Sequence, residues 1–363
     1  MSSETKAKQK ITSGRGLSVA AVQMDANPAP TADRLARAER LVSGAVESGA
    51  QLTVLPELFN TGYTYSDVNH TRVESLDGPT VTWMGDAAAR HGSHLAGSLM
   101  LLDQGEVYNA LLLFAPDGRM WRYDKNYPWG WERGYFRESC RDPKVTVAET
   151  DLGNIGMLIC WDAAHLSLWE RYAGQVDLMV ICSCPPDVGD PIYHFPNGDQ
   201  VTLDDMGSMV AFAKGTAARL FGDMINQQTA WLGVPAVNTV GCGHIRTSIP
   251  KGRLSLLGYA LAVPWLLKYL PQADGLQMSC DMVHKCKVVD AGGEVLAELT
   301  KSDGEAFALA KVHLAGSVSY RQQPQPSSLV PKPAYFLSDI LLPTITKPVY
   351  RKGQRLWDKP LVR

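Results

Sequence analysis

Residues 155–162 read IGMLICWD, an apolar run that ends in a cysteine, a tryptophan and an aspartate. The run Ile155 to Ile159 is typical of a short strand buried inside a sheet, and residues 166–173 favour a helix. Cys160 therefore follows a strand and opens into a helix, the position of a nucleophile on a strand-to-helix turn. A helix N-terminus favours the thiolate form of such a cysteine. A buried structural cysteine is the alternative, and this segment alone does not separate the two.

Strand and helix patterns alternate through the first half of the chain. Residues 107–114 and 120–124 predict two strands, which the turn at Ala115–Gly118 would join into a hairpin. Strands that alternate with helices, with hairpins inserted, predict a layered α/β domain. The other predicted strands are 17–24, 52–55, 94–101, 144–149, 155–159 and 178–182, and the predicted helices are 31–48, 80–91 and 166–173.

The composition excludes several classes of protein. The chain has 363 residues, 45% of them apolar, and a formal net charge of −2, so no strong field steers it to nucleic acid or an anionic membrane. Seven cysteines in so long a chain do not suggest a disulfide framework, and a reducing, cytoplasmic compartment fits better. Residues 1–16 are polar and lack the apolar core of a signal peptide, so we expect a disordered lead-in.

Two further segments place a reactive side chain after a predicted strand. Glu57 follows residues 52–55 and Pro56, at the carboxyl end of a strand, where open α/β sheets hold ligands. Lys125 follows the predicted hairpin, and Glu132 comes soon after it. A lysine held here could stabilise an oxyanion. Taken singly, each of these residues has the plainer interpretation of a solvated surface side chain.

Taken together, Glu57, Lys125 and Cys160, each after a strand and in that order, resemble the triad of the nitrilase (carbon–nitrogen hydrolase) superfamily. The resemblance runs from Leu17 to Cys184. So many motifs in the family's order would not be expected by chance. The segments that carry it are Ala20–Met24, Pro56–Glu57, Tyr108–Ala110, Pro116–Gly118, Arg122–Lys125, and Glu132 with Tyr135–Phe136.

The resemblance implies the family fold, a four-layer αββα sandwich with two sheets between layers of helices. Residues 17–315 would form this single large domain. Residues 316–363 begin rich in Pro, Ser and Gln and would form an extended C-terminal arm. Family members commonly pair across a helix face, and such arms often cross to the neighbour. We therefore expect a homodimer or a higher homo-oligomer.

The resemblance also implies roles for individual residues. Cys160 would attack the substrate carbon and form a thioester, while Glu57 would act as general base and return the proton to the departing amine. Lys125 and the backbone N–H of Trp161 would stabilise the oxyanion, and Glu132 would orient the substrate or Lys125. No cofactor and no metal are expected. The aromatic residues expected to contact substrate are Tyr63, Trp129, Trp131 and Trp161.

The residues around the cysteine bear on the substrate. Cys160-Trp-Asp162 favours amides, because family members that hydrolyse nitriles often carry glutamate in place of the aspartate. Leu166, however, stands where many relatives have proline. We predict hydrolysis of a linear, non-peptide amide or N-carbamoyl compound. The expected substrate is a small molecule of hydrophobic character. The alternative is an acyltransferase that passes the same thioester to an amine, and nitrile hydrolysis is third.

Three other functions can be considered from the sequence: a cysteine protease, a metal site and a non-catalytic binding protein. His165 or His194 could pair with Cys160 as in a cysteine protease, but this leaves the triad's glutamate and lysine unexplained. Cys182-Ser-Cys184 with His194 is a weak metal motif, because no second pair completes a tetrahedral set. A non-catalytic binding protein on the same fold is the third, and it is disfavoured because all four chemical positions are filled.

Residues 254–270, LSLLGYALAVPWLLKYL, are the nearest approach to a membrane-spanning run. Pro264 and the length of the segment argue against a spanning helix. A buried helix or an interface insert is the plainer prediction. The sharper hypothesis is an apolar lid over the substrate pocket, or a membrane-touching element, for hydrophobic substrates.

Overall fold

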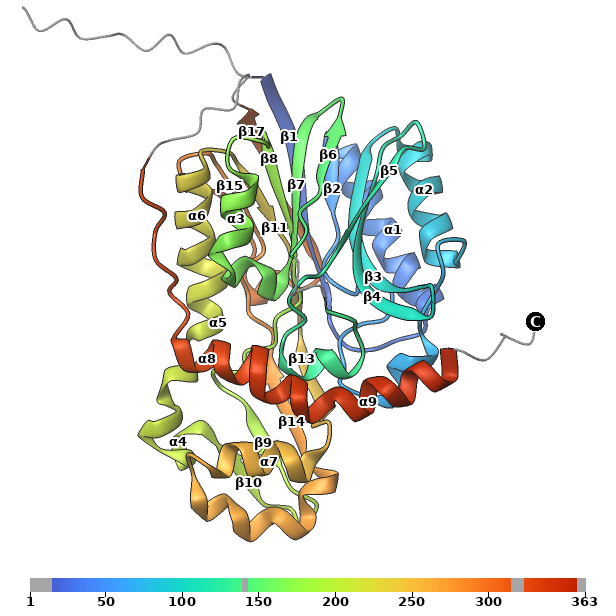
Figure 1. Cartoon of the computed structure of the whole chain (residues 1–363). Helices are drawn as coiled ribbons and strands as arrows, with labels where there is room; N and C mark the ends of the chain where they lie inside the picture. Colours follow the sequence, from blue (N-terminus) through green and yellow to red (C-terminus); the bar gives the residue numbers. More distant parts are fainter. Residues whose placement is uncertain (1–14, 139–142, 315–322, 358–363) are drawn as a thin grey trace, which may run out of the picture.

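The computed structural model describes residues 15–138, 143–314 and 323–357. Within these ranges, two large β-sheets pack face to face, and helices cover the outer face of each sheet (Figure 1). The predicted αββα sandwich is therefore confirmed. The outer helices are α1 (Thr31–Glu47) and α2 (Pro79–His91) on the first sheet, and α3 (Leu166–Tyr172) and α6 (Ile225–Leu232) on the second.

Both sheets mix parallel and antiparallel strands. In the described part of the chain, the first sheet runs β12 (Val240–Cys242), β1 (Arg15–Asp25), β2 (Leu52–Val54), β3 (His94–Asp103), β4 (Glu106–Phe114), β5 (Met120–Asp124), with β17 (Ala306–Leu314) also paired to β1. The second runs β16 (Val295–Glu298), β15 (Lys287–Val289), β11 (Ala236–Asn238), β8 (Leu178–Cys182), β7 (Gly153–Ile159), β6 (Val147–Thr150). The predicted hairpin is the antiparallel pair β4–β5.

The first strand begins earlier than the sequence suggests. Arg15 and Gly16, placed in the predicted lead-in, continue the antiparallel ladder between β1 and β17. Backbone hydrogen bonding to β17, which is nearly 300 residues away in the chain, decides this boundary, and no local pattern in β1 reveals it. The rest of the predicted lead-in, residues 1–14, lies outside the described residues.

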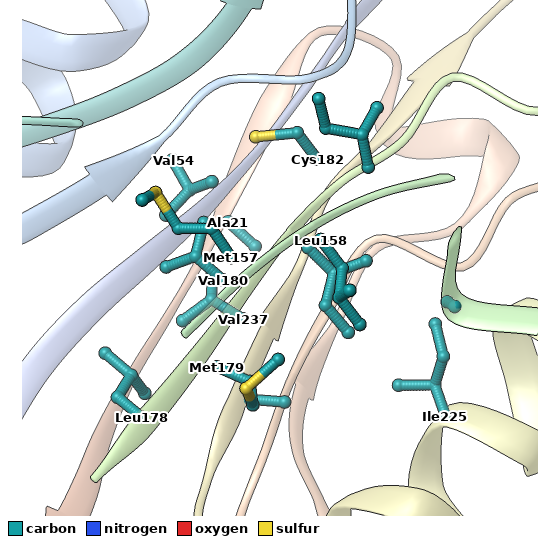
Figure 2. Close-up of a cluster of buried hydrophobic side chains, with 14 of the residues drawn as sticks. Ala21, Val54, Met157, Leu158, Leu178, Met179, Val180, Cys182, Ile225 and Val237 are labelled. Atoms are coloured by element: carbon teal, nitrogen blue, oxygen red, sulfur yellow. The ribbon is translucent and has the colours of Figure 1, made fainter. Parts of the chain in front are cut away.

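The core between the sheets is built from alternate residues of the facing strands. Figure 2 shows Ala21 and Val54 of the first sheet beside Met157, Val180 and Val237 of the second, and all five are fully buried. The strand register explains the grouping. Met157 and Val237 both pair with Val180 across adjacent strands, so the three side chains point to one face. Burying a side chain such as Val180 stabilises the fold by roughly 1.5–3 kcal/mol.

The predicted apolar insert 254–270 belongs to a smaller unit at the lower end of the sandwich in Figure 1. Its helices are α7 (Gly252–Ala260) and the 3-10 helix η6 (Pro264–Gly275), which begins at the proline. They pack beside a small sheet through Leu256 and Leu266, while Leu261 is 81% exposed. The prediction of a buried helix is thus right for the face that carries Leu256 and Leu266 and wrong for Leu261. The small sheet runs β10 (Gln200–Thr202), β9 (Ile192–His194), β14 (Gln277–Asp281), β13 (His244–Ser248).

None of the helices formed by the described residues is both long and apolar enough to cross a membrane.

The C-terminal segment is mostly helical, and the prediction of an extended arm is wrong for residues 332–357. They form α8 (Lys332–Phe336), a π-helical turn η8 (Leu337–Leu341) and α9 (Leu342–Trp357), which lie end to end across the front of the molecule (Figure 1). Pro331 and Pro333 lie at the start of α8, where proline is tolerated, and Pro348 lies inside α9. Residues 315–322 and 358–363 of the predicted arm lie outside the described residues.

The C-terminal helix docks on the chain's own turn η2 (Gly130–Gly134). Two glycines permit the close approach. A Cβ at Gly130 would lie 2.8 Å from Leu342, and a Cβ at Gly134 would lie 3.2 Å from Val349. The segment that was expected to reach a partner subunit therefore has a docking surface within its own subunit.

Candidate active site

The structure brings the four predicted chemical residues together. Glu57 comes after β2, Lys125 directly after β5 and Cys160 directly after β7, so both large sheets contribute. Glu132 lies in η2, the turn that follows β5. Each of these residues is at most 5% exposed. The strand ends thus concentrate two carboxylates, an ammonium and a thiol in one buried region.

Lys125 lies between the two glutamates. Its Nζ is 2.7 Å from Glu57 Oε1 and 2.6 Å from Glu132 Oε2. Burial alone would lower the pKa of Lys125, but the Glu132 and Glu57 carboxylates outweigh it and raise that pKa well above its usual range. Lys125 is therefore charged at neutral pH. An ammonium without water around it is a strong source of positive potential for a developing oxyanion.

Glu57 is fixed by donors on both of its oxygens. Asn109 Nδ2 donates to Oε1 at 2.7 Å, and the backbone N–H of Cys184 donates to Oε2 at 2.9 Å. Asn109 is itself oriented by Ser98, whose hydroxyl donates to its Oδ1 at 3.0 Å. Burial raises the pKa of Glu57, Lys125 acts in the opposite direction and Glu132 adds to the rise. The carboxylate is therefore held in one orientation and is easier to protonate than an exposed one.

Glu132 is held by three donors. Besides Lys125, the hydroxyl of Tyr63 donates to its Oε1 at 2.5 Å, and the backbone N–H of Trp129 donates to its Oε2 at 2.9 Å. Tyr63 in turn is 2.9 Å from the hydroxyl of Tyr65. Such a saturated carboxylate has little freedom to move, which suits a residue that positions the lysine.

Cys160 has an unusual backbone. Its φ is +49°, the left-handed region that non-glycine residues rarely adopt. Strained conformations of this kind cluster at functional sites, where the surrounding structure enforces them. The strained residue lies at the junction of β7 and the 3-10 helix η3 (Cys160–Ala164).

The expectation that a helix N-terminus makes Cys160 a thiolate is wrong. Only a short 3-10 turn starts at this residue. Burial and the Glu57 carboxylate raise the pKa of the Cys160 thiol well above its usual range, although Lys125 acts in the opposite direction. The resting side chain is therefore a neutral thiol, and a base must remove its proton before it can attack.

Cys160 opens onto a cavity of about 690 Å³, a volume that includes the space open to solvent at its mouth. The reactive end is lined by Glu132 and Cys160, and the remaining walls are mainly apolar. Those walls are Tyr63, Trp129 and Trp161; Pro185, Pro186 and Val188; Phe212, Ala213, Thr216, Ala217, Leu220 and Phe221; and Ala334, Leu337 and Ser338.

Three of the four predicted aromatic contacts lie where expected, since Tyr63, Trp129 and Trp161 line the cavity. Trp131 does not. It is fully buried behind the wall, and its Nε1 donates to the Ser255 hydroxyl at 3.2 Å. The insert 254–270, all of which is described, contributes no residue to the lining, so it is not a lid over this cavity.

The histidines are engaged elsewhere. His165 Nδ1 is 3.1 Å from the Trp161 carbonyl oxygen, and its Nε2 is 3.1 Å from Asp339 Oδ2. Both ring nitrogens are thus occupied, which argues against His165 as the base for Cys160. His194 Nε2 lies 2.8 Å from the Ser279 hydroxyl in the small sheet. Within the described ranges, no group of three metal-ligating side chains is arranged to hold an ion.

Sequence reasoning missed the C-terminal contribution to this site. Asp339 accepts hydrogen bonds from Trp161 Nε1 at 3.0 Å and lies 3.1 Å from His165 Nε2. The hydroxyl of Tyr335 donates to the Ala164 carbonyl oxygen at 2.6 Å. The C-terminal helix therefore clamps the turn that carries Cys160. No sequence signal marked Asp339, because a single aspartate in an amphipathic helix is ordinary.

The family model for carbon-nitrogen hydrolases matches residues 18–322. The chain belongs to the carbon-nitrogen hydrolase family. This carbon-nitrogen hydrolase is 30% identical over 147 residues to a nitrilase from Pyrococcus abyssi, a match that covers 40% of this chain and 55% of the relative. It is 31% identical over 151 residues to an omega-amidase from Danio rerio, covering 39% of this chain and 54% of the relative. The chain thus spans about half the length of these curated relatives.

Solved structures show the same fold. An amidase from Nesterenkonia sp. AN1 superposes with a TM-score of 0.60 at 17% identity, covering 86% of this chain and 97% of the amidase. A nitrilase-superfamily member from Saccharomyces cerevisiae gives a TM-score of 0.57 at 18% identity, covering 85% and 93%. The predicted family and its αββα fold are both confirmed for this carbon-nitrogen hydrolase.

Proposed function

We propose that this chain hydrolyses the C–N bond of a linear, non-peptide amide or N-carbamoyl compound through a thioester on Cys160. One observation carries the proposal: a buried ammonium, Lys125, is held between two carboxylates beside a neutral thiol that opens onto a cavity with mainly apolar walls. That set contains a nucleophile, a base and an oxyanion stabiliser. Its relatives include a nitrilase and an omega-amidase, which act on C–N bonds.

The first half-reaction forms the thioester. Glu57 takes the proton from the Cys160 thiol as the sulfur attacks the carbonyl carbon of the substrate. The carbonyl oxygen becomes an oxyanion, which Lys125 and the backbone N–H of Trp161 stabilise. When the tetrahedral intermediate collapses, the C–N bond breaks, and Glu57 returns its proton to the departing amine or ammonia.

The second half-reaction regenerates the enzyme. A water molecule gives a proton to Glu57 and attacks the thioester carbon, and the same donors stabilise the second oxyanion. The C–S bond then breaks, the carboxylic acid leaves, and the proton on Glu57 returns to the Cys160 sulfur. Glu57 therefore begins and ends each half-reaction as a carboxylate, and Cys160 is a neutral thiol again when the cycle closes.

The preference for an amide comes from the Cys160-Trp-Asp162 sequence, and Asp162 supports the site from outside the cavity. That aspartate is fully buried outside the lining, where its Oδ2 accepts from the Tyr123 hydroxyl and its Oδ1 from the Tyr127 backbone N–H, both at 2.8 Å. It ties the loop after β5 to the Cys160 turn and does not touch substrate. The mainly apolar walls of the cavity favour an acyl group with hydrophobic character.

Product analysis tests the proposal. A panel of primary amides, N-carbamoyl compounds and nitriles is incubated with the enzyme, with and without an added amine. We expect amides to give the free carboxylic acid, and N-carbamoyl compounds to give an amine, ammonia and carbon dioxide, in both conditions. Accumulation of a new amide only when amine is added would show acyl transfer, and turnover confined to nitriles would replace the amide assignment.

The pH dependence of turnover reports on Glu57. Only its carboxylate form can accept a proton, so kcat/KM should rise with pH as Glu57 ionises. Because burial raises the pKa of Glu57, this acid limb should lie above the range near about 4.3 in which exposed glutamates titrate. Glu57→Gln should remove the limb and lower kcat by roughly 10²–10⁴-fold.

Glu149→Gln, on the exposed face of β6, is the matched control for this measurement. It should leave both the rate and the pH profile unchanged. A native acid limb at the ordinary glutamate value, or one that persists in Glu57→Gln, would show that another group is the base.

The Asp339 clamp predicts a positioning effect. Asp339→Ala removes the acceptor shared by Trp161 Nε1 and His165 Nε2, which should loosen the Cys160 turn. We expect kcat to fall about tenfold or more, the order of one hydrogen bond to a charged acceptor, with a smaller change in KM. Asp339→Asn keeps an oxygen acceptor and should recover part of the loss. Ile340→Ala, at the next residue of the helix and 59% exposed, is the control. Equal losses of kcat in both alanine variants would show that Asp339 stabilises the helix in general and does not position the Cys160 turn.

Cytoplasmic location and homo-oligomer formation stay predictions.

A further inference from the structure

One hydroxyl in the cavity wall stands apart from the other polar groups there. Ser338, on the C-terminal helix, is 1% exposed, and its Oγ has no hydrogen-bond partner. Three other polar side chains of the lining have partners: Tyr63 donates to Glu132, Thr216 Oγ1 donates to the Phe212 carbonyl oxygen at 2.7 Å, and Trp161 donates to Asp339. Buried hydroxyls normally have a partner, so an unpaired one in a ligand cavity calls for a reason.

The helix itself could have supplied a partner but does not. Serine and threonine inside helices commonly donate to the carbonyl oxygen four residues earlier. Two threonines of the same helix do so: Thr344 Oγ1 donates to the Ile340 carbonyl oxygen at 2.9 Å, and Thr346 Oγ1 to that of Leu342 at 3.0 Å. Ser338 lies in η8, where the helix widens to a π-helical turn. Ser338 is one of the residues that line the cavity, and its Oγ makes no hydrogen bond back along the helix.

A second π-helical turn lines the same cavity. It is η5 (Leu220–Met224), whose Leu220 and Phe221 belong to the apolar walls. Such turns are rare and are frequently found at functional sites, because they displace side chains from their normal helical positions. Two separate segments of the chain therefore depart from α-helical geometry where they face this cavity.

We propose that Ser338 is a specificity residue that hydrogen bonds to one uncharged polar group on the acyl chain of an otherwise apolar amide. The inference rests on the proposed function, since it takes the acyl group of the Cys160 thioester as the occupant. The acyl group is favoured over the leaving amine because it stays bound through both half-reactions. A hydroxyl, ether or ketone oxygen on that chain would satisfy the Ser338 hydroxyl.

The charge of the lining explains why the polar group is uncharged. Among the described residues that line the cavity there is no arginine or lysine, and Glu132 is the one carboxylate. A carboxylate on the acyl chain would lose its hydration without gaining a cation, and the nearby Glu132 would repel it. An ammonium on the chain would be drawn to Glu132, whose oxygens are already held by Tyr63, Trp129 and Lys125.

The test compares matched amides in native enzyme and Ser338→Ala. One series carries plain straight alkyl chains, and the other carries a single hydroxyl, ether or ketone group at successive positions along the same chains. We expect native enzyme to prefer one polar member over its alkyl counterpart by about tenfold in kcat/KM, the effect of one neutral hydrogen bond. Ser338→Ala should remove this preference while leaving the alkyl amides within about twofold. Ser338→Thr, which keeps the hydroxyl, should retain part of it.

A second readout separates substrate binding from an internal structural role. In the free enzyme, the unpaired Ser338 hydroxyl makes no hydrogen bond that stabilises the fold, so Ser338→Ala should leave Tm unchanged or raise it. Ile340→Ala, the exposed neighbour on the same helix, should change neither the preference nor Tm.

The outcomes distinguish the specificity of Ser338 from the proposed function itself. If amides are hydrolysed but Ser338→Ala keeps the native preference ratio, or if its Tm falls, the role of Ser338 is overturned and the proposed function stands. If no amide or N-carbamoyl compound is hydrolysed and no adduct forms on Cys160, both proposals are overturned.

Discussion

Cys160→Ala will abolish turnover. The alanine cannot form the thioester, and the other groups of the site would be left to act on bound water. In an enzyme whose nucleophile acts as a unit with its base, removing it lowers kcat by about 10⁶-fold. The assay is turnover of the best amide of the panel, measured to the limit of detection, together with a mass search for any acyl adduct.

Cys286→Ala is the matched control for the nucleophile. Cys286 is fully buried like Cys160, but it does not line the cavity. Its replacement should cost some stability through lost packing and leave kcat unchanged. Turnover that survives in Cys160→Ala at more than a trace would show that the reaction does not pass through this sulfur.

Lys125→Met will damage both activity and stability. The methionine fills a similar volume without the charge, so the oxyanion loses its ammonium, and kcat should fall by about 10²–10³-fold or more. The two glutamates would remain buried without their shared cation. Breaking a buried ion pair from one side costs roughly 3–5 kcal/mol of folding free energy, so the urea midpoint should drop clearly at neutral pH.

Two further variants isolate the charge. Lys125→Met combined with Glu132→Gln removes one carboxylate and should recover part of the stability but none of the activity. Lys287→Met removes a second buried lysine, whose pKa burial lowers to about 8 and whose Nζ donates to the Gly222 carbonyl oxygen. Among the described residues, no carboxylate accepts a hydrogen bond from that lysine, so its loss should cost no more than about 1 kcal/mol. Equal destabilisation by Lys125→Met and Lys287→Met would contradict the account of the ion cluster.

The elements and residues that the sequence predicts correctly are those with a local signature. The apolar run 178–182 matches β8 residue for residue, because a buried strand shows its burial in its own composition. Residues 120–124 match β5 because the turn at Ala115–Gly118 predicts a hairpin. Glu57, Lys125 and Cys160 were identifiable because each follows a predicted strand. The carboxyl ends of strands are where ligand sites form, so a reactive residue at that position is informative.

What the sequence does not reveal depends on contacts between distant segments. The protonation state of Cys160 is set by burial and by Glu57, which is far from it in sequence, and this outweighs the local turn. The C-terminal helix contains prolines that normally end helices, and it forms because Gly130 and Gly134 let it pack against η2. No sequence pattern marks Ser338, because only the folded structure shows that its buried hydroxyl has no hydrogen-bond partner.

The central claim, a covalent acyl-enzyme on Cys160, can be tested by intact-mass analysis of enzyme quenched with acid during turnover of an amide. The account predicts a mass increase equal to the acyl group, located on the peptide that contains Cys160 and absent from Cys160→Ala. Hydrolysis that proceeds with no adduct under rapid quenching, or an adduct located on any other residue, would contradict it.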